Sequence, residues 1–223
     1  MKVSPFGSHG RILRYLSDRP KTVRILDVGT AQGYLGRALR EAGFTRVAGL
    51  EKDPLYAEAA RSVYTDVIEY DLDASGPCPL TGPFDLILCA DVLEHLKDPW
   101  KALKSLVPLL SPQGRLIVSV PNSGHWWMRL NVFCGRFPRE ERGLFDRGHL
   151  QFFTWATLRE LVSQAGLLIE QVWITPVPFS IFCGDKIGNP MALWLEAAYG
   201  AFSHLWKRLF AYQFILCTTV RAG

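Results

Sequence analysis

Residues 25–36 read Ile25-Leu26-Asp27-Val28-Gly29-Thr30-Ala31-Gln32-Gly33-Tyr34-Leu35-Gly36, and this stretch decides the fold. It joins an apolar, strand-like run to the start of a helix through glycines. Gly29 can take backbone angles that are closed to other residues, and Gly33 lets a ligand approach the main chain closely. The first amides of the following helix point to the same place. The stretch therefore predicts a strand, a ligand-binding loop and a helix, in that order.

The acid in this stretch indicates which ligand the loop binds. A dinucleotide fingerprint reads G-x-G-x-x-G, whereas this chain reads Asp-x-Gly-x-x-x-Gly from Asp27 to Gly33. A carboxylate repels a pyrophosphate but suits a ligand with an ammonium and a sulfonium group, and S-adenosylmethionine carries both. Glu51 ends the next strand-like run, about 20 residues after the loop, where ribose hydroxyls are usually held. The alternative is that Asp27 and Glu51 only cap strand ends in an unrelated α/β domain.

Strand-like and helix-like segments alternate along the chain. Apolar runs predict strands at residues 23–28, 47–51, 67–70, 84–90, 115–120, 168–175 and 214–220. Periodic segments predict helices at residues 9–16, 33–42, 55–62, 99–110, 157–164 and 191–209. This alternation is typical of a doubly wound, Rossmann-like α/β sheet. No linker divides residues 1–223, so we expect a single domain.

Residues 122–155 break the alternation between the fifth and sixth predicted strands. Eight of the chain's 27 aromatic side chains and five arginines lie in this segment, with no clean period. We interpret it as an aromatic-rich insertion that serves as a substrate cap or lid. Its aromatic residues are predicted to form an apolar acceptor wall, with arginines available for a phosphate or carboxylate. The residues concerned are Trp126, Trp127, Phe133, Phe137, Phe145, Phe152 and Phe153, with Arg129, Arg136 and Arg147.

Composition indicates the cellular compartment of the protein and the kind of molecule that it binds. The formal net charge is +4, and the basic residues are scattered among acidic ones, so no nucleic-acid footprint is visible. The five cysteines form no C-x-x-C pair, which argues against a disulfide framework and a zinc knuckle. The first 15 residues lack the apolar core of a signal peptide. We therefore expect a cytoplasmic protein that acts on a small or lipid-like molecule.

Three segments together resemble the class I S-adenosylmethionine-dependent methyltransferases, across essentially the whole chain. They are Leu26-Asp27-Val28-Gly29 through Gly33, Phe84-Asp85-Leu86-Ile87 through Asp91-Val92-Leu93-Glu94-His95-Leu96, and Leu110-Ser111-Pro112-Gln113-Gly114-Arg115-Leu116 through Ser119-Val120-Pro121-Asn122. The resemblance implies a seven-stranded sheet whose last strand is antiparallel. Within the family, the chain is most similar to the ubiquinone-type O-methyltransferase and methionine-biosynthesis-protein-W-like groups. It departs from the usual pattern at residues 30–32, where a cysteine or second glycine is expected.

The resemblance also implies roles for individual residues. Asp27, Gly29 and Gly33 would line the methionine end of the cofactor, and Glu51 would hold its ribose. Asp71, just after the third predicted strand, matches the acid that receives the adenine amino group. Asp91, at the end of the fourth predicted strand, would face the reacting methyl group. The implied reaction is in-line SN2 methyl transfer to a small-molecule, glycan or lipid-like acceptor, and we expect oxygen to be the attacking atom.

An oxygen acceptor needs a base or a metal that favours the oxyanion. The segment Asp91-x-x-Glu94-His95 offers His95 as a base, and a similar segment in ubiquinone-type O-methyltransferases is linked to a divalent metal. A hard divalent ion usually recruits more oxygen ligands than this segment provides, so a metal is possible but not favoured. Otherwise Glu94 and His95 would only cap a helix and shape the pocket. His149 is a second candidate base, with a structural role as its alternative.

The C-terminal helix and the overall activity each leave two interpretations open. An aromatic stripe with Lys207-Arg208 beside it, in the predicted helix at residues 191–209, could make peripheral membrane contact, or could be a core or homodimer face. The rival to an enzyme is a non-catalytic protein of the same fold that binds S-adenosylmethionine and regulates a partner. A nicotinamide oxidoreductase is a weaker rival, because the third glycine and a separate substrate domain are lacking.

Overall fold

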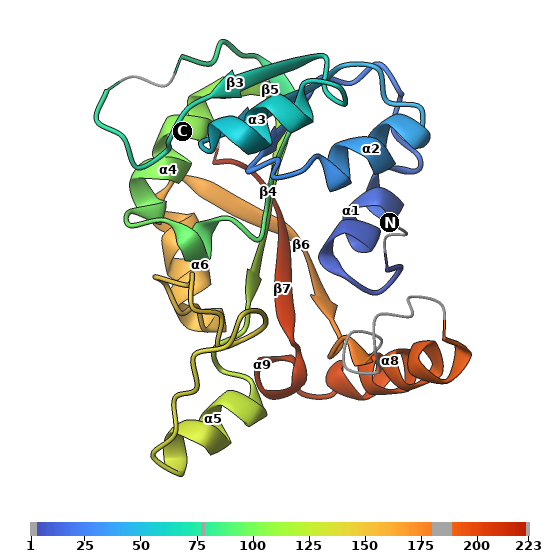
Figure 1. The fold of residues 1–223 in the computed structure, drawn as a ribbon, viewed down its shortest axis with the longest axis vertical. Helices are drawn as coiled ribbons and strands as arrows, with labels where there is room; N and C mark the ends of the chain where they lie inside the picture. The colour runs from blue at the N-terminus through green and yellow to red at the C-terminus, as the bar shows by residue number, and fades with distance from the viewer. Residues whose placement is uncertain (1–3, 77–78, 180–188, 222–223) are drawn as a thin grey trace.

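A computed structural model describes residues 4–76, 79–179 and 189–221. Its centre is a seven-stranded sheet of order β3-β2-β1-β4-β5-β7-β6 (Figure 1). The strands are β1 (Ile25–Val28), β2 (Val47–Glu51), β3 (Asp66–Glu69), β4 (Phe84–Ala90), β5 (Leu110–Pro121), β6 (Leu167–Thr175) and β7 (Gln213–Val220). The first five strands pair in parallel, whereas β7 is antiparallel to both β5 and β6. The predicted doubly wound sheet with an antiparallel last strand is therefore confirmed.

Helices cover both faces of the sheet. The helices are α1 (Ser8–Leu16), α2 (Tyr34–Glu41), α3 (Pro54–Ala60), α4 (Pro99–Leu106), α5 (Trp126–Phe133), α6 (Trp155–Gln164), α8 (Pro190–Ser203) and α9 (Lys207–Phe210). Apolar side chains of α1, α2 and α3 form one buried cluster, and those of α4 and α6 form the other. Within β4, Leu86 and Leu88 belong to the first cluster, and Ile87 and Cys89 to the second. This alternation follows from the two-residue period of a strand buried on both faces.

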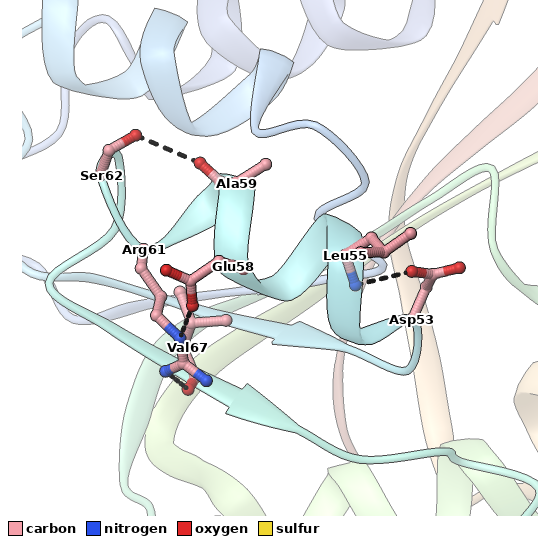
Figure 2. A network of polar contacts seen from close by, with 7 residues as sticks. All are labelled: Asp53, Leu55, Glu58, Ala59, Arg61, Ser62 and Val67. Atoms are coloured by element: carbon pink, nitrogen blue, oxygen red, sulfur yellow. Dashed lines mark hydrogen bonds and ion pairs between the residues drawn. The ribbon is translucent and has the colours of Figure 1, made fainter.

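Local polar contacts fix α3 between β2 and β3 (Figure 2). The Asp53 carboxylate caps the helix by accepting a hydrogen bond of 2.9 Å from the Leu55 amide, and Pro54 occupies the first helical position. At the other end, Arg61 contacts the Glu58 carboxylate at 3.0 Å and donates to the Val67 carbonyl at 3.3 Å. These contacts hold the segment that follows Glu51.

Two predicted helices end earlier than the sequence pattern suggested. The helix predicted at residues 99–110 stops at Leu106 and passes into a 3₁₀ turn, η2 (Val107–Leu109), because Pro108 has no amide hydrogen to donate. The helix predicted at residues 191–209 is two helices, α8 and α9. At the break, the Ser203 hydroxyl donates to the Tyr199 carbonyl at 2.7 Å and to the Phe210 carbonyl at 3.2 Å. The chain turns here so that it can enter β7.

One edge of the sheet collects the ends of several elements. β4 and β5 are in register at Ala90 and Ser119, and Pro121 of β5 pairs with Gln213 at the start of β7. Residues 122–155 leave from this edge after β5, pass through α5, and return to α6. α9 reaches the same edge just before β7. Ligands of α/β proteins bind outside the carboxyl ends of the parallel strands, and here that is this edge.

Candidate active site

A cavity of about 340 Å³ lies beside the glycine loop. It is lined by Val28, Gly29, Ala31, Leu50, Glu51, Lys52, Tyr56, Tyr70, Asp71, Leu72, Asp91, Val92, His95 and Leu96. Four residues predicted to bind the cofactor, Gly29, Glu51, Asp71 and Asp91, therefore meet in one place. Gly29 has a φ of +72°, and a Cβ there would lie 2.8 Å from Cγ2 of Val92. Only glycine fits this position without strain. We call this hollow the cofactor cavity.

Glu51 is anchored by backbone amides. Its Oε2 accepts from the Ala31 amide at 2.7 Å, and its Oε1 accepts from the amides of Lys52 and Asp53 at 2.9 and 3.0 Å. The side chain is buried at the rim of the cofactor cavity. The bond to Ala31, whose φ is +44°, ties the glycine loop to the end of β2. Glu51 thus orients the loop as well as presenting a carboxylate to the cavity.

Two further predicted residues, Asp27 and Gly33, do not line the cofactor cavity. Asp27 is only 2% exposed, and its Oδ2 accepts a hydrogen bond of 2.5 Å from the Tyr64 hydroxyl. That hydroxyl accepts in turn from the Gly36 amide at 3.1 Å in the first turn of α2. Burial raises the pKa of Asp27 to about 7, with the Glu51 charge adding to the effect and the Tyr64 bond opposing it. Asp27 is therefore linked through Tyr64 to the first turn of α2, and it stabilises the glycine loop and this helix without lining the cavity.

A second cavity, of about 350 Å³, adjoins the first. We call it the acceptor cavity. Its lining includes Ser4, Phe6, Gly7, Ser8, Asp91, Glu94, His95, Pro121, Gly143, Asp146, His149, Thr175, Pro176, Pro178, Glu196, Tyr212 and Gln213. Among the described residues, Asp91 and His95 alone line both hollows, so the two cavities meet at these side chains. All three residues predicted to be catalytic, Asp91, His95 and His149, border the acceptor cavity.

Asp91 is fixed by donors from three distant elements. Its Oδ1 accepts from the Ser119 hydroxyl at 2.7 Å and from the Gln213 side-chain amide at 2.9 Å. Its Oδ2 accepts from the Ser8 hydroxyl at 2.9 Å. The backbone of Asp91 is left-handed, with a φ of +59°, which is uncommon for a non-glycine residue. These contacts hold the carboxylate rigidly where the cavities meet.

Glu94, His95 and His149 form a compact cluster at the acceptor cavity. Their ligating atoms all lie within 4.8 Å of one another, and the two imidazole rings meet edge to face with centroids 5.0 Å apart. His95 Nδ1 lies 3.0 Å from the Gly148 carbonyl, which can only accept, so this nitrogen carries a proton, and in the neutral ring Nε2 is the nitrogen with the lone pair. Burial lowers the pKa of His149, with a further contribution from His95, so His149 stays neutral near pH 7.

Comparison with known proteins identifies the family. A family model for a methyltransferase domain matches residues 8–172, from α1 into β6. The chain belongs to the class I S-adenosylmethionine-dependent methyltransferases. It is an enzyme of this family, and S-adenosylmethionine is its cofactor. Loop, sheet order and the cavity beside Gly29 all agree with this assignment.

Curated relatives and solved structures agree with the family. The chain is 36% identical to a ubiquinone biosynthesis O-methyltransferase of Xylella fastidiosa over 72% of this chain and 68% of that protein. It is 25% identical to the enzyme of the same description from Aeromonas salmonicida, over 67% of this chain and only 64% of that protein. The fold matches magnesium protoporphyrin IX methyltransferase from Synechocystis with a TM-score of 0.64 at 19% identity, over 96% of this chain and 82% of that one. That structure holds bound S-adenosylhomocysteine (SAH).

The chemistry of the Glu94 cluster in this methyltransferase fits a divalent transition metal. The Glu94 side chain is 1% exposed, and neither carboxylate oxygen has a hydrogen-bond partner among the residues placed in the structure. Burial raises its pKa, and the Asp91 charge adds to the shift. One carboxylate and two imidazoles suit zinc or iron better than magnesium, which prefers oxygen ligands. The sequence argument against a hard ion therefore still holds, but His149 adds a second imidazole, which the segment at residues 91–95 lacks.

The predicted aromatic acceptor wall does not line the acceptor cavity of the methyltransferase. Phe145 is buried with Met128 and Leu144 in a small separate cluster. Phe133, Phe137 and Phe152 border a different hollow, and Trp126 and Trp127 are exposed. From residues 122–155, the acceptor cavity takes only Gly143, Asp146 and His149. The predicted arginines, Arg129, Arg136 and Arg147, are also absent from its lining.

Several site residues carry no motif that sequence reasoning could detect. Tyr64, Ser8, Ser119 and Gln213 support Asp27 or Asp91, but each is a common polar residue far from its partner in the chain. Ser8 and Gln213 lie 83 and 122 residues from Asp91. Only the parallel sheet and the antiparallel return of β7 bring these segments together. Ser119 lies in a predicted strand and Gln213 directly before one, which was the one available signal for these two residues.

Proposed function

We propose that S-adenosylmethionine binds in the cofactor cavity with its methyl group directed toward Asp91 and His95. Gly29 would admit the methionine end, Glu51 would hold the ribose, and Asp71 would receive the adenine amino group. Asp27 and Gly33 would support this site through the loop. The observation that carries the proposal is the meeting of the two cavities at Asp91 and His95. A methyl donor in one cavity and an acceptor in the other would be aligned there for in-line attack.

The acceptor is proposed to be an uncharged hydroxyl compound, such as a small molecule, a glycan or a lipid-like molecule. Four carboxyl side chains, Asp91, Glu94, Asp146 and Glu196, line the acceptor cavity, and no lysine or arginine of the described chain does. Such a lining disfavours a phosphate or carboxylate acceptor by charge repulsion. Transfer to oxygen is supported by the imidazoles at the cavity and by the similarity to O-methyltransferases. The segment at 143–149 would close the cavity as the part of the predicted lid that reaches it.

The proposed reaction is one SN2 displacement. The acceptor oxygen attacks the methyl carbon, the carbon–sulfur bond breaks, and its electron pair returns to sulfur to give neutral S-adenosylhomocysteine. The acceptor's hydroxyl proton passes to Nε2 of His95, whose ring is oriented by the Gly148 carbonyl. Neutral His149 hydrogen-bonds the acceptor beside it, and the fixed Asp91 carboxylate faces the sulfonium charge. Positioning and the exclusion of water supply most of the acceleration, because the sulfonium is already a strong electrophile.

A divalent metal is the second candidate for activating the hydroxyl. Glu94, His95 and His149 would hold it, and it would act as a Lewis acid that lowers the pKa of the acceptor hydroxyl. The two routes predict different responses to chelation. Turnover that is unchanged in the chelator EDTA supports proton transfer to His95, whereas turnover that is lost and then restored by zinc, manganese or iron supports the metal.

The test is methyl transfer from labelled S-adenosylmethionine to a panel of catechols, phenols and neutral hydroxylated lipids. Carboxylate-bearing analogues serve as the charged comparison. With an acceptor in hand, His95→Gln should lower kcat by roughly 10²- to 10⁴-fold, a far larger effect than any change in cofactor affinity. His204→Gln, in the exposed turn after α8, is the matched control. Methylation at nitrogen or sulfur, a preference for anionic acceptors, or an unchanged kcat in His95→Gln would contradict the proposal.

A further inference from the structure

Aromatic side chains form a continuous path over one end of the molecule. Trp126 and Trp127 of α5 meet edge to face, with ring centroids 5.7 Å apart. The Trp126 ring nitrogen donates to the Tyr199 hydroxyl of α8 at 3.1 Å. From there the path runs through Phe202 to Phe210 and Trp206, with successive centroids 6.4, 4.6 and 6.5 Å apart. Figure 1 shows α5, α9 and α8 together at the lower end of the molecule. We call this surface the aromatic end.

Much of the aromatic end faces solvent. Phe133 is 89% exposed, Leu205 81% and Trp194 68%, and further apolar side chains around them are exposed to a lesser degree. The latter are Trp126, Trp127, Leu130, Val132, Phe137, Met191, Phe202 and Trp206. Isolated exposed apolar side chains are ordinary, but exposed rings that contact one another, as on the path from Trp127 to Trp206, mark a surface that binds a membrane or another molecule.

The exposed charged side chains on the helices of the aromatic end are cations. Arg129 and Arg136 lie in or just after α5, and Lys207 and Arg208 lie in α9; all four are exposed. Within α5, α8 and α9 the one acidic residue is Glu196, which is buried; the exposed acids Glu140 and Glu141 follow Arg136 outside these helices. Surfaces that bind other proteins usually carry charged residues of both signs. Cations beside exposed tryptophans are typical of surfaces that contact anionic lipid headgroups.

We propose that the aromatic end docks on the surface of an anionic lipid membrane. Tryptophans would sit at the headgroup level, with phenylalanine and leucine below them and the four cations against the phosphates. The contact is peripheral, because no helix of the described residues is long and apolar enough to cross a bilayer. This docking extends the C-terminal stripe seen in the sequence to α5, which the Trp126–Tyr199 bond joins to α8.

The docked orientation would bring the acceptor cavity close to the lipid. Glu196 of α8 lines that cavity, and Trp194, two residues earlier in the same helix, is exposed. Tyr212 and Gln213, which also line the cavity, directly follow α9. The same surface that contacts the membrane is therefore built on the elements that border the acceptor site.

The test is cosedimentation of the full chain with vesicles, without any methyl donor. Two compositions are compared: phosphatidylcholine alone, and phosphatidylcholine with about 30% phosphatidylglycerol, a proportion that supplies the anionic surface charge. We expect binding to the anionic vesicles that weakens with salt, and little binding to the zwitterionic ones. Removing Trp206 and Lys207 together, as Trp206→Ala with Lys207→Ala, should weaken binding at least about tenfold. Phe133→Ala with Arg136→Ala should weaken it similarly if α5 shares the surface.

The matched control removes one aromatic residue and one cation elsewhere. Trp100 and Lys104 form such a pair on α4, with the ammonium 4.2 Å from the ring centroid. Trp100→Ala with Lys104→Ala should leave vesicle binding unchanged. Thermal melting and titration with S-adenosylmethionine on every variant separate loss of docking from misfolding and from failure of the proposed reaction. Absence of binding to both vesicles, equal effects of test and control pairs, or a dimer that the Trp206 pair converts to monomer would overturn the proposal.

Discussion

Asp27→Asn should change how the stability of the fold depends on pH. The Asp27 carboxyl is buried, and its pKa in the folded state is about 7 against an ordinary value of 3.8. The folded state therefore binds this proton more tightly than the unfolded state, so stability rises as pH falls from about 7 toward 4. This rise in pKa from 3.8 to about 7 corresponds to about 4 kcal/mol, which is the cost of burying ionised Asp27 at pH 8.

Asparagine keeps the shape and still accepts from Tyr64, but it has no charge to bury. In the natural chain, the cost of burying ionised Asp27 should fall by pH 5 to less than half of its value at pH 8. The variant has no such cost at either pH. We expect Asp27→Asn to raise the free energy of unfolding relative to the natural chain at both pH values. This gain should be larger at pH 8 than at pH 5, by about 2 to 3 kcal/mol.

Urea unfolding followed by tryptophan fluorescence, at pH 5 and pH 8, measures this difference. Subtracting the free energy of unfolding of the natural chain from that of the variant removes the pH dependence of all other groups. Asp66→Asn, at an exposed position on β3, is the control with which the effect of Asp27→Asn is compared. An equal difference at both pH values, or a variant that loses more stability at pH 8 than at pH 5, would refute a buried Asp27 with a raised pKa.

Two further predictions concern packing and the helix cap of α5. Gly36→Ala places a Cβ 2.3 Å from Cζ of the Tyr64 ring. We therefore expect the free energy of unfolding in urea to fall by about 1 to 3 kcal/mol. Unchanged stability would show that Tyr64 does not pack there. Burial lowers the pKa of His125 from 6.5 to about 4, so stability should fall by up to about 3 kcal/mol as pH drops through that interval. His125→Asn keeps a capping side chain and should reduce that acid loss, which unfolding at pH 7 and pH 4.5 would measure.

The sheet, and the convergence of Gly29, Glu51, Asp71 and Asp91 at one cavity, could be predicted because the relevant signals are local. Each predicted strand is a short apolar run, and Gly29, Glu51, Asp71 and Asp91 all follow such runs. Parallel strands end at one edge, so these four residues had to converge. The exceptions in the fold were also local: Pro108 and Ser203 end helices that apolar periodicity alone would continue.

The acceptor side could not be predicted in the same way, because it depends on long-range packing. Glu94, His95 and His149 come together only when residues 143–149 return to η1 (Leu93–His95), where the Glu94 carbonyl accepts from the Leu150 amide at 2.8 Å. Periodicity also could not show that Trp126, Trp127, Phe133, Phe137 and Phe152 are exposed while Phe145 and Phe153 are buried away from the acceptor cavity. A cytoplasmic location and a homodimer stay predictions, and Cys78 and Cys183 lie outside the described residues.

Calorimetric titration with S-adenosylmethionine, on the natural chain and on Glu51→Gln, tests the central assignment most directly. Glu41→Gln, at an exposed position on α2, is the matched control. We predict micromolar binding to the natural chain and to the control. In Glu51→Gln, the loss of charge-assisted bonds worth about 1.5 to 3 kcal/mol should weaken binding by roughly tenfold to a hundredfold. No binding to the natural chain, or equal affinity in Glu51→Gln, would contradict the assignment of the cofactor cavity.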